Sequence, residues 1–195
     1  MPIPVNASYE SQVHPGNTVW AVQEPGAFDL LRDLVKEEAP EIIIELGTCA
    51  GGLTLVLHEA LPEAWLFSFD ICNDPDGECV SHASSGFQQV SKALYGPRVI
   101  FCQANVLKHA PTHQMLELAL AQDGRKLLLC DNGLKRAEVA LYAPRLTKGD
   151  VIGVHDWNEE IRAEDVAETL AAFEPLRWQE CEERKSLWRF WRRVE

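Results

Sequence analysis

The sequence predicts an α/β protein with a doubly wound, mostly parallel sheet, helices on both faces and an antiparallel hairpin at its C-terminal end. Three observations predict this fold class. Short apolar runs typical of buried strands alternate with segments of helical periodicity. A glycine-rich turn follows the first of these strands, and two strand-like runs follow each other near the end of the sequence. Strands that alternate with helices pair in parallel through right-handed crossovers.

The first half of the chain alternates helix and strand. Apolar residues recur at helical spacing over residues 23–40, which predicts a helix there. The three isoleucines that follow are bounded by glutamates and predict a short buried strand over residues 42–45. A second helix is expected over residues 52–61, because a proline follows it. A second strand, residues 64–71, reaches its polar end at Asp70.

The second half continues this alternation. We expect strands over residues 98–104, 126–131 and 150–156, and helices over residues 87–94, 112–121, 137–142 and 163–173. The polar, turn-rich residues 72–86 are expected to form a loop over a site. Two runs, residues 176–183 and 186–194, are joined by a charged turn and predict the closing antiparallel hairpin.

Length and composition limit the classes of protein that fit. With 195 residues, 46% of them hydrophobic, we expect one domain over residues 1–195, with residues 1–25 as a candidate N-terminal lid. No apolar run approaches the length of a membrane span, and the first residues lack the layout of a secretion signal, so we expect a cytoplasmic protein. The formal net charge of −12 disfavours nucleic acid as a partner and favours small or cationic ligands.

The glycine-rich turn "LGTCAGG" should lie at the edge of the sheet where ligands bind. A dinucleotide fingerprint needs three glycines so that the backbone can approach a pyrophosphate. Gly47 and Gly52 match two of these positions, but Cys49 occupies the middle one. In this Rossmann-like setting the turn therefore favours a nucleoside without a pyrophosphate over NAD or FAD. S-adenosylmethionine is such a ligand.

Two carboxylates flank the turn. Glu45 ends the first strand, and Asp70 ends the second, where an acidic side chain can accept both ribose hydroxyls of a nucleoside. The alternative is that Glu45 caps nearby amides and that Asp70 only forms a turn. Together with Gly47, Thr48 and Gly51 of the turn, they are our candidate residues for binding S-adenosylmethionine.

The stretch "IIIELGTCAGGLTLVL" resembles the first motif of class I S-adenosylmethionine-dependent methyltransferases, in particular of the cephalosporin hydroxylase and rhamnosyl O-methyltransferase family. The stretches "NTVWAVQEPGAFDLL" and "LYAPRLTKGDVIGVHDW" also resemble this family, so the likeness spans most of residues 17–157. The resemblance implies that Gly47, Gly51 and Asp70 contact S-adenosylmethionine and that Asn105, after the third strand, lies near the adenine. Many methyltransferases carry an acidic residue there, and a turn-capping role is the alternative for Asn105.

Two further strands, residues 126–131 and 150–156, should lie side by side or nearly so. Asp131 and Asp156 would then converge at the carboxyl edge of the sheet, with His155 beside them. Asp131 is also a candidate cofactor contact, and all three residues are candidate ligands of a divalent cation such as Mg²⁺, which would lower the pKa of a substrate hydroxyl. The arrangement resembles metal-dependent O-methyltransferases, but some of these carry an acidic pair in place of His155–Asp156. Strand-end hydrogen bonds, or substrate contacts without a metal, are the alternatives.

Two residues are candidate catalytic bases. His155 can accept a proton because an imidazole titrates near neutral pH. Lys135 follows Asp131 by four residues, and a lysine close to the corresponding aspartate is the base in catechol-type methyltransferases, although the spacing here differs. The alternatives are a histidine that is merely hydrogen-bonded and a lysine that is solvated on a helix.

These observations predict a methyltransferase that uses S-adenosylmethionine to methylate a hydroxyl of a small metabolite or sugar, with Mg²⁺ as a candidate second cofactor. A non-catalytic S-adenosylmethionine-binding protein and an NAD-dependent enzyme are the alternatives. Basic and aromatic residues at 184–193 would suit nucleic acid, but alternation along a strand would scatter them over both faces. The oligomeric state stays open, a homo-oligomer included.

Overall fold

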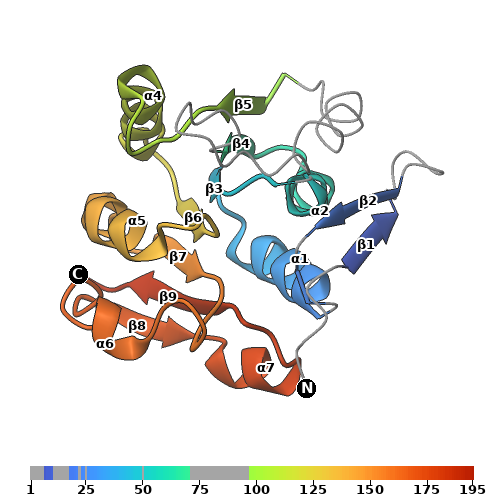
Figure 1. Ribbon diagram of the computed structural model, residues 1–195, viewed down its shortest axis with the longest axis vertical. Coiled ribbons are helices and arrows are strands. Elements are labelled where there is room, and N and C mark those ends of the chain that lie inside the picture. The colour runs from blue at the N-terminus through green and yellow to red at the C-terminus, as the bar shows by residue number, and fades with distance from the viewer. Residues whose placement is uncertain (1–6, 11–17, 22, 25, 50, 71–96) are drawn as a thin grey trace.

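The computed structural model describes residues 7–10, 18–21, 23–24, 26–49, 51–70 and 97–195. Within these residues the main sheet has seven strands, in the order β5-β4-β3-β6-β7-β9-β8 (Figure 1). Their bounds are β3 Ile42–Leu46, β4 Trp65–Asp70, β5 Val99–Gln103, β6 Lys126–Cys130, β7 Val151–Val154, β8 Phe173–Leu176 and β9 Arg189–Arg193. The strands from β5 to β7 pair in parallel, and β9 runs antiparallel between β7 and β8. The predicted fold class is therefore confirmed.

Helices cover both faces of the sheet (Figure 1). One face is covered by α1 Ala27–Glu38 and α2 Gly52–Ala60, and α7 Trp178–Glu183 packs its Cys181 into the same core. The other face is covered by α4 Ala110–Leu120, α5 Lys135–Tyr142 with its short extension η1 Ala143–Arg145, and α6 Ala163–Val166. The sheet is thus a middle layer with an apolar core on each side.

The central strand β3 shows why an unbroken apolar run predicts a strand in this fold. Successive side chains of a strand point to opposite faces. Ile43 packs into the core beneath α1 and α2, whereas Ile42 and Ile44 pack into the core beneath α4 and α5. All five residues of β3 are buried. Because both faces are covered, side chains that follow the ends of β6 and β7, such as Asp131, His155 and Asp156, lie at one edge of the sheet, next to the turn after β3.

The C-terminal region differs from the expectation in two places. The helix expected over residues 163–173 ends at Val166, and the run 176–183 is not a strand, because most of it forms α7. The strand that pairs with β9 is β8, which comes earlier, at Phe173–Leu176. This strand is only four residues long and contains a proline, which an edge strand tolerates because the edge needs no donor there. So short a segment carries no clear alternation in the sequence.

The N-terminal segment forms a hairpin that the sequence did not predict. The strands β1 Ala7–Glu10 and β2 Thr18–Ala21 pair antiparallel in a separate sheet that lies against α2 (Figure 1). A lid role for residues 1–25 stays a prediction. The expected loop 72–86 and helix 87–94 lie outside the described residues. None of the helices in the described part of the chain is long and apolar enough to cross a membrane.

Candidate functional site

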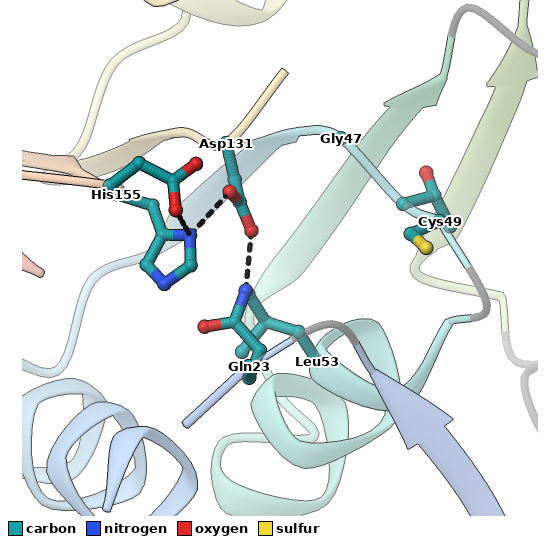
Figure 2. Close-up of a pocket in the computed structure, with 8 residues that line it drawn as sticks. Gln23, Gly47, Cys49, Leu53, Asp131 and His155 are labelled. Atoms are coloured by element: carbon teal, nitrogen blue, oxygen red, sulfur yellow. Dashed lines mark hydrogen bonds and ion pairs between the residues drawn. The ribbon is translucent and has the colours of Figure 1, made fainter. Parts of the chain in front are cut away.

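A pocket of about 160 Å³ opens where β3, β6 and β7 end. Figure 2 shows the residues that line it, with the turn after β3 on one side and polar side chains on the other. These residues are Gln23, Gly47, Thr48, Cys49, Leu53, Asp131, His155 and Asp156. Five of the predicted site residues, namely Gly47, Thr48, Asp131, His155 and Asp156, therefore lie together at one pocket.

The turn after β3 has a backbone that most side chains would not permit. Gly47, Cys49 and Gly51 all have positive φ angles, of 111°, 48° and 84°. A Cβ atom at Gly47 would lie 2.5 Å from the carbonyl oxygen of Asp131. Gly51 is the N-cap of α2, and its N–H donates to the carbonyl of Thr48 at 2.8 Å. The glycines thus hold the turn against the end of β6 and direct the start of α2 toward the pocket.

Asp70 lies beside this turn, as predicted. It ends β4 and is largely buried, and its Oδ2 accepts a hydrogen bond from the Cys49 N–H at 2.5 Å. Asn105 instead lies away from the lining of the pocket. Its Oδ1 accepts from the Leu107 N–H at 2.9 Å, which is the turn-capping arrangement considered as the alternative. Contacts of either residue with a cofactor stay predictions.

Glu45 is sealed beneath the turn. One carboxyl oxygen accepts hydrogen bonds from the Thr54 hydroxyl at 2.7 Å and the Ser68 hydroxyl at 2.5 Å, and the other has no hydrogen-bond partner among the residues that the structure describes. Burial raises the pKa of Glu45 to about 8, against the lowering effect of the Ser68 and Thr54 hydrogen bonds. Glu45 therefore joins β3 to β4 and α2 as an uncharged group at neutral pH and does not line the pocket.

Asp131 receives hydrogen bonds from two sides (Figure 2). Its Oδ2 accepts from the Gln23 side-chain amide at 2.5 Å, and its Oδ1 accepts from His155 Nδ1 at 2.8 Å. The other ring nitrogen of His155 meets Glu24 Oε2 at 2.9 Å, and the ring is 2% exposed. Because an ionised carboxylate only accepts hydrogen bonds, both ring nitrogens must carry a proton. His155 is therefore an imidazolium held between two carboxylates.

Gln23 and Glu24 reach the site from the segment before α1. Glu24 Oε1 accepts from the Ser186 hydroxyl at 2.5 Å and the Leu187 N–H at 2.6 Å. The side-chain amide oxygen of Gln23, Oε1, accepts from the Trp188 indole N–H at 2.8 Å. Glu24 is not among the site residues that the sequence predicted. Its partner His155 is 131 residues away along the chain, and no local pattern indicates such a pair.

Lys135 extends the cluster of charged residues formed by Glu24, Asp131, His155 and Asp156, which it contacts through Asp156. It opens α5, and its Nζ lies 2.6 Å from Asp156 Oδ2 and 2.9 Å from Glu160 Oε2. Asp156 follows β7 with a left-handed φ of 56°, and its Oδ1 lies 3.3 Å from His155 Nδ1. The structure thus brings the two candidate bases to one pair of aspartates, and each of the two already has carboxylate partners.

The pKa shifts agree with this pairing. Burial by itself would lower the pKa of His155, but the charge and hydrogen bond of Asp131, with the bonds to Asp156 and Glu24, raise it well above its usual value. Burial would likewise lower the pKa of Lys135, but Asp131, Asp156 and Glu160 raise it. The carboxyl groups of Asp156 and Glu24 shift in the opposite direction. Burial by itself would raise the pKa of each, but the hydrogen bond to His155 contributes to a net lowering. At neutral pH the cluster consists of charged, mutually paired groups.

Solved structures share this fold at low sequence identity. The O-methyltransferase TomG from Streptomyces achromogenes, in complex with S-adenosylmethionine, is 16% identical over 87% of this chain and 80% of its own, with a TM-score of 0.56. The apo structure of CmcI-N160 is 13% identical over 96% of this chain and 76% of its own, with a TM-score of 0.60. An O-methyltransferase family protein from Burkholderia thailandensis is 10% identical over 87% of this chain, with a TM-score of 0.56, and this chain spans only 55% of its length.

The sequence comparisons add nothing to this likeness, because no protein-family profile and none of the curated proteins matches the chain. The chain has the fold of these solved structures, of which TomG and the Burkholderia thailandensis protein are described as O-methyltransferases. The resemblance inferred from the glycine turn is therefore confirmed at the level of the fold.

Proposed function

We propose that this chain binds S-adenosylmethionine and transfers its methyl group to a hydroxyl of a small molecule. One observation carries the proposal. In the fold of O-methyltransferases, a turn held open by Gly47 and Gly51 lies across a pocket from Asp131 and His155, and Asp70 ends the next strand. This is the edge at which open α/β sheets bind their ligands.

The chemistry of the pocket fits S-adenosylmethionine better than a dinucleotide. Among the described residues, the charged groups that line the pocket are Asp131, His155 and Asp156, so carboxylates exceed cations there. An acidic lining favours a ligand with a sulfonium and an ammonium group and disfavours a pyrophosphate. Asp70, which supports the turn through Cys49, is the residue that we assign to the ribose hydroxyls, since a carboxylate can accept several hydrogen bonds.

The residues of the chain would act mainly by orientation. When bound, S-adenosylmethionine supplies a methyl group activated by the sulfonium. The pocket residues would hold the acceptor oxygen in line with that group and exclude water, which supplies much of the rate acceleration in such transfers. His155 and Lys135 are protonated in their ion pairs, so we assign them the role of holding Asp131 and Asp156 in place. Asp131, whose Oδ2 accepts from the uncharged Gln23 amide, is then the group that we assign to accept the proton of the substrate hydroxyl.

Calorimetric titration with S-adenosylmethionine and with S-adenosylhomocysteine tests the cofactor assignment. We expect one binding site per chain, with affinity reduced about tenfold or more in the Asp70→Asn variant, which keeps one acceptor oxygen but loses the charge. Glu168→Gln, at an exposed position that is not among the residues named as lining the pocket, is the matched control and should bind as the wild type does. If the wild type binds neither compound, the proposal fails.

A non-catalytic S-adenosylmethionine-binding protein is the second candidate. It is favoured by the ion pairs of His155 and Lys135, because these leave neither candidate base able to accept a proton. Transfer of a labelled methyl group to catechols, phenols and sugars separates the two functions. Turnover on any acceptor supports the enzyme, whereas cofactor binding without turnover across the panel supports the binding protein. Binding of NADH without binding of S-adenosylmethionine would indicate an NAD-dependent enzyme instead.

The remaining expectations stay predictions. They are a small hydroxylated substrate, one domain, a cytoplasmic location, a homo-oligomer as one open state, and no role for nucleic acid. The donor set of the predicted Mg²⁺ site is together, since Asp131, His155 and Asp156 each offer an atom within 4.8 Å of the others. Their present hydrogen bonds, however, do not fit Mg²⁺, because the atoms that would ligate it are held by cations of the chain itself.

A further inference from the structure

The two carboxylates at the carboxyl edge of the sheet each carry a cation already. Asp131 Oδ1 accepts from His155 Nδ1 at 2.8 Å, and Asp156 Oδ2 lies 2.6 Å from Lys135 Nζ. The second oxygen of Asp156 lies 3.3 Å from the same His155 nitrogen. A hard divalent cation binds through carboxylate oxygens of this kind. Here those oxygens face ring and ammonium N–H groups that are directed at them.

The His155 ring cannot supply a metal ligand in this arrangement. A metal needs an unprotonated imidazole nitrogen with its lone pair available. Both ring nitrogens meet carboxylates, at 2.8 Å on Asp131 and 2.9 Å on Glu24, so both must carry protons. Glu24 cannot easily move away, because its other oxygen accepts from Ser186 and from the Leu187 backbone, and the side chain is 2% exposed. Glu24 thus fixes the ring as a cation.

Leaving aside the mostly exposed Glu160, the charges of the cluster nearly balance without a metal. Three carboxylates, on Glu24, Asp131 and Asp156, face two cations, on His155 and Lys135. A fourth carboxylate, the mostly exposed Glu160, contacts the outer side of Lys135 at 2.9 Å. A divalent ion among the three inner carboxylates would place four positive charges beside three negative ones. Such a site offers the ion little electrostatic gain.

We propose that His155 and Lys135 take the place of a divalent cation in this chain, so that Asp131 and Asp156 are held by the protein's own charges and do not bind Mg²⁺. Glu24 is the positioning residue that keeps His155 in this role. The inference concerns the same pocket as the proposed function but does not rest on it, because metal binding is measured on the protein alone. Loss of the cofactor assignment would leave it standing.

Titration of the chelator-treated wild-type protein with Mn²⁺, followed by calorimetry and by the electron paramagnetic resonance signal of free Mn²⁺, tests the proposal. We expect no ion bound at this site, and a thermal midpoint that neither Mg²⁺ nor chelator changes. Mn²⁺ bound at one ion per chain and lost in a folded Asp131→Asn variant would overturn the proposal. If Mn²⁺ binds equally well to the wild type and to Asp131→Asn, the ion is bound elsewhere on the chain, and this result agrees with the proposal.

Substitutions of His155 test whether its positive charge is the reason that the site does not bind a divalent cation. His155→Glu replaces the imidazolium with a third carboxylate and should raise Mn²⁺ affinity about tenfold or more over the wild type. The matched control His155→Gln removes the same charge without adding a carboxylate, so its Mn²⁺ affinity should increase less. A folded His155→Glu variant with no gain would overturn the assignment of His155 as the group in the metal's place. If His155→Glu does not fold by circular dichroism, Lys135→Met serves instead, since it uncovers Asp156 and should also increase Mn²⁺ binding, and no gain there would overturn the role of Lys135.

Discussion

Glu45 and Asp131 are both carboxyl groups at strand ends of one sheet, yet their surroundings differ. Asp131 lines the pocket and accepts hydrogen bonds from Gln23 and His155. Glu45 is fully buried, and within the described part of the chain its hydrogen-bond partners are the hydroxyls of Thr54 and Ser68, which leave one oxygen without a partner. In the sequence the two positions look alike. What distinguishes them is the supply of charged partners, which the tertiary fold determines.

Glu45 should make the stability of the protein depend on pH. Its pKa rises from an ordinary 4.5 to about 8, first because of burial and further because Asp131 and Asp70 are negative. A folded state that holds the proton more tightly loses stability as pH rises between these two values. We expect the free energy of unfolding to fall across this window in the wild type and to fall less in Glu45→Gln. Urea unfolding at several pH values measures the effect.

The control for this experiment is the exposed carboxylate of Glu168, whose replacement by glutamine should leave the slope with pH unchanged. Equal slopes for the wild type and Glu45→Gln would show that Glu45 ionises in the folded state much as it does in the unfolded chain. That result would contradict the assignment of Glu45 as an uncharged group.

Glu24 should contribute strongly to stability, although it lies in a polar segment before the first helix. It holds the His155 imidazolium, the Ser186 hydroxyl and a backbone N–H inside the protein. Removing one partner of a buried ion pair typically costs about 3–5 kcal/mol, because the other charge stays buried. We expect Glu24→Ala to lose stability of this order in urea unfolding.

The matched comparison is the surface pair of Asp33 with Arg184, whose atoms are 2.7 Å apart and whose aspartate is 48% exposed. Asp33→Asn should cost less than about 1 kcal/mol, because water screens exposed pairs. Similar losses in Glu24→Ala and Asp33→Asn would indicate that the Glu24 pair contributes no more than a surface pair.

At the scale of an element, the turn between β3 and α2 depends on space as well as on backbone angles. Gly47 and Gly149 both have positive φ angles, of 111° and 93°. A Cβ at Gly47 would collide with the backbone of Asp131, whereas a Cβ at Gly149 would meet no described atom within 4 Å. The two glycines therefore separate the cost of the backbone angle from the cost of the collision.

We expect Gly149→Ala to cost about 1–2 kcal/mol, which is the usual penalty for a left-handed side-chain-bearing residue. Gly47→Ala should cost about 3 kcal/mol or more, because β3 and β6 must also move apart. Chemical unfolding of both variants measures the difference. Equal costs would mean that the turn can shift away from β6 without loss.

Most strands of the main sheet could be predicted from the sequence alone, but some elements near the C-terminus could not. The strands β3, β4, β6 and β7 were expected within one or two residues, because strands buried on both faces are unbroken apolar runs. β8 was missed because an edge strand such as "FEPL" has a half-exposed, proline-containing pattern that resembles a turn. α7 was read as a strand because its few apolar residues fit either period.

The site was predicted in part for the same reason. Residues at the ends of parallel strands necessarily meet at one edge of the sheet, so Asp131, His155 and Asp156 could be grouped from the sequence. Their partners could not. Glu24 reaches His155 from a segment outside the regular elements of the chain, and no periodicity places such a segment in space. The ion pairs that set the charge of the cluster are therefore visible only in the folded molecule.

At the scale of the whole molecule, the excess of 30 acidic over 18 basic residues should influence ligand binding. S-adenosylmethionine carries a positive sulfonium that S-adenosylhomocysteine lacks. We expect the dissociation constant of S-adenosylmethionine to rise roughly twofold or more between about 0.05 M and about 0.5 M salt, because salt screens long-range attraction. The dissociation constant of S-adenosylhomocysteine should change less. Calorimetric titrations of both compounds across this range make the comparison, and equal salt dependence would argue against an electrostatic contribution.

The ring of Trp188 lies against the His155 ring, with centroids 4.9 Å apart, and its indole N–H is bonded to Gln23. A protonated imidazole in contact with an indole quenches its fluorescence, so Trp188 should emit weakly in the native protein. His155→Gln should therefore brighten tryptophan emission without unfolding the chain, and an emission spectrum that does not change would contradict this. The intrinsic fluorescence of Trp188 would thus report on the charge of His155, which lines the pocket, without any added dye.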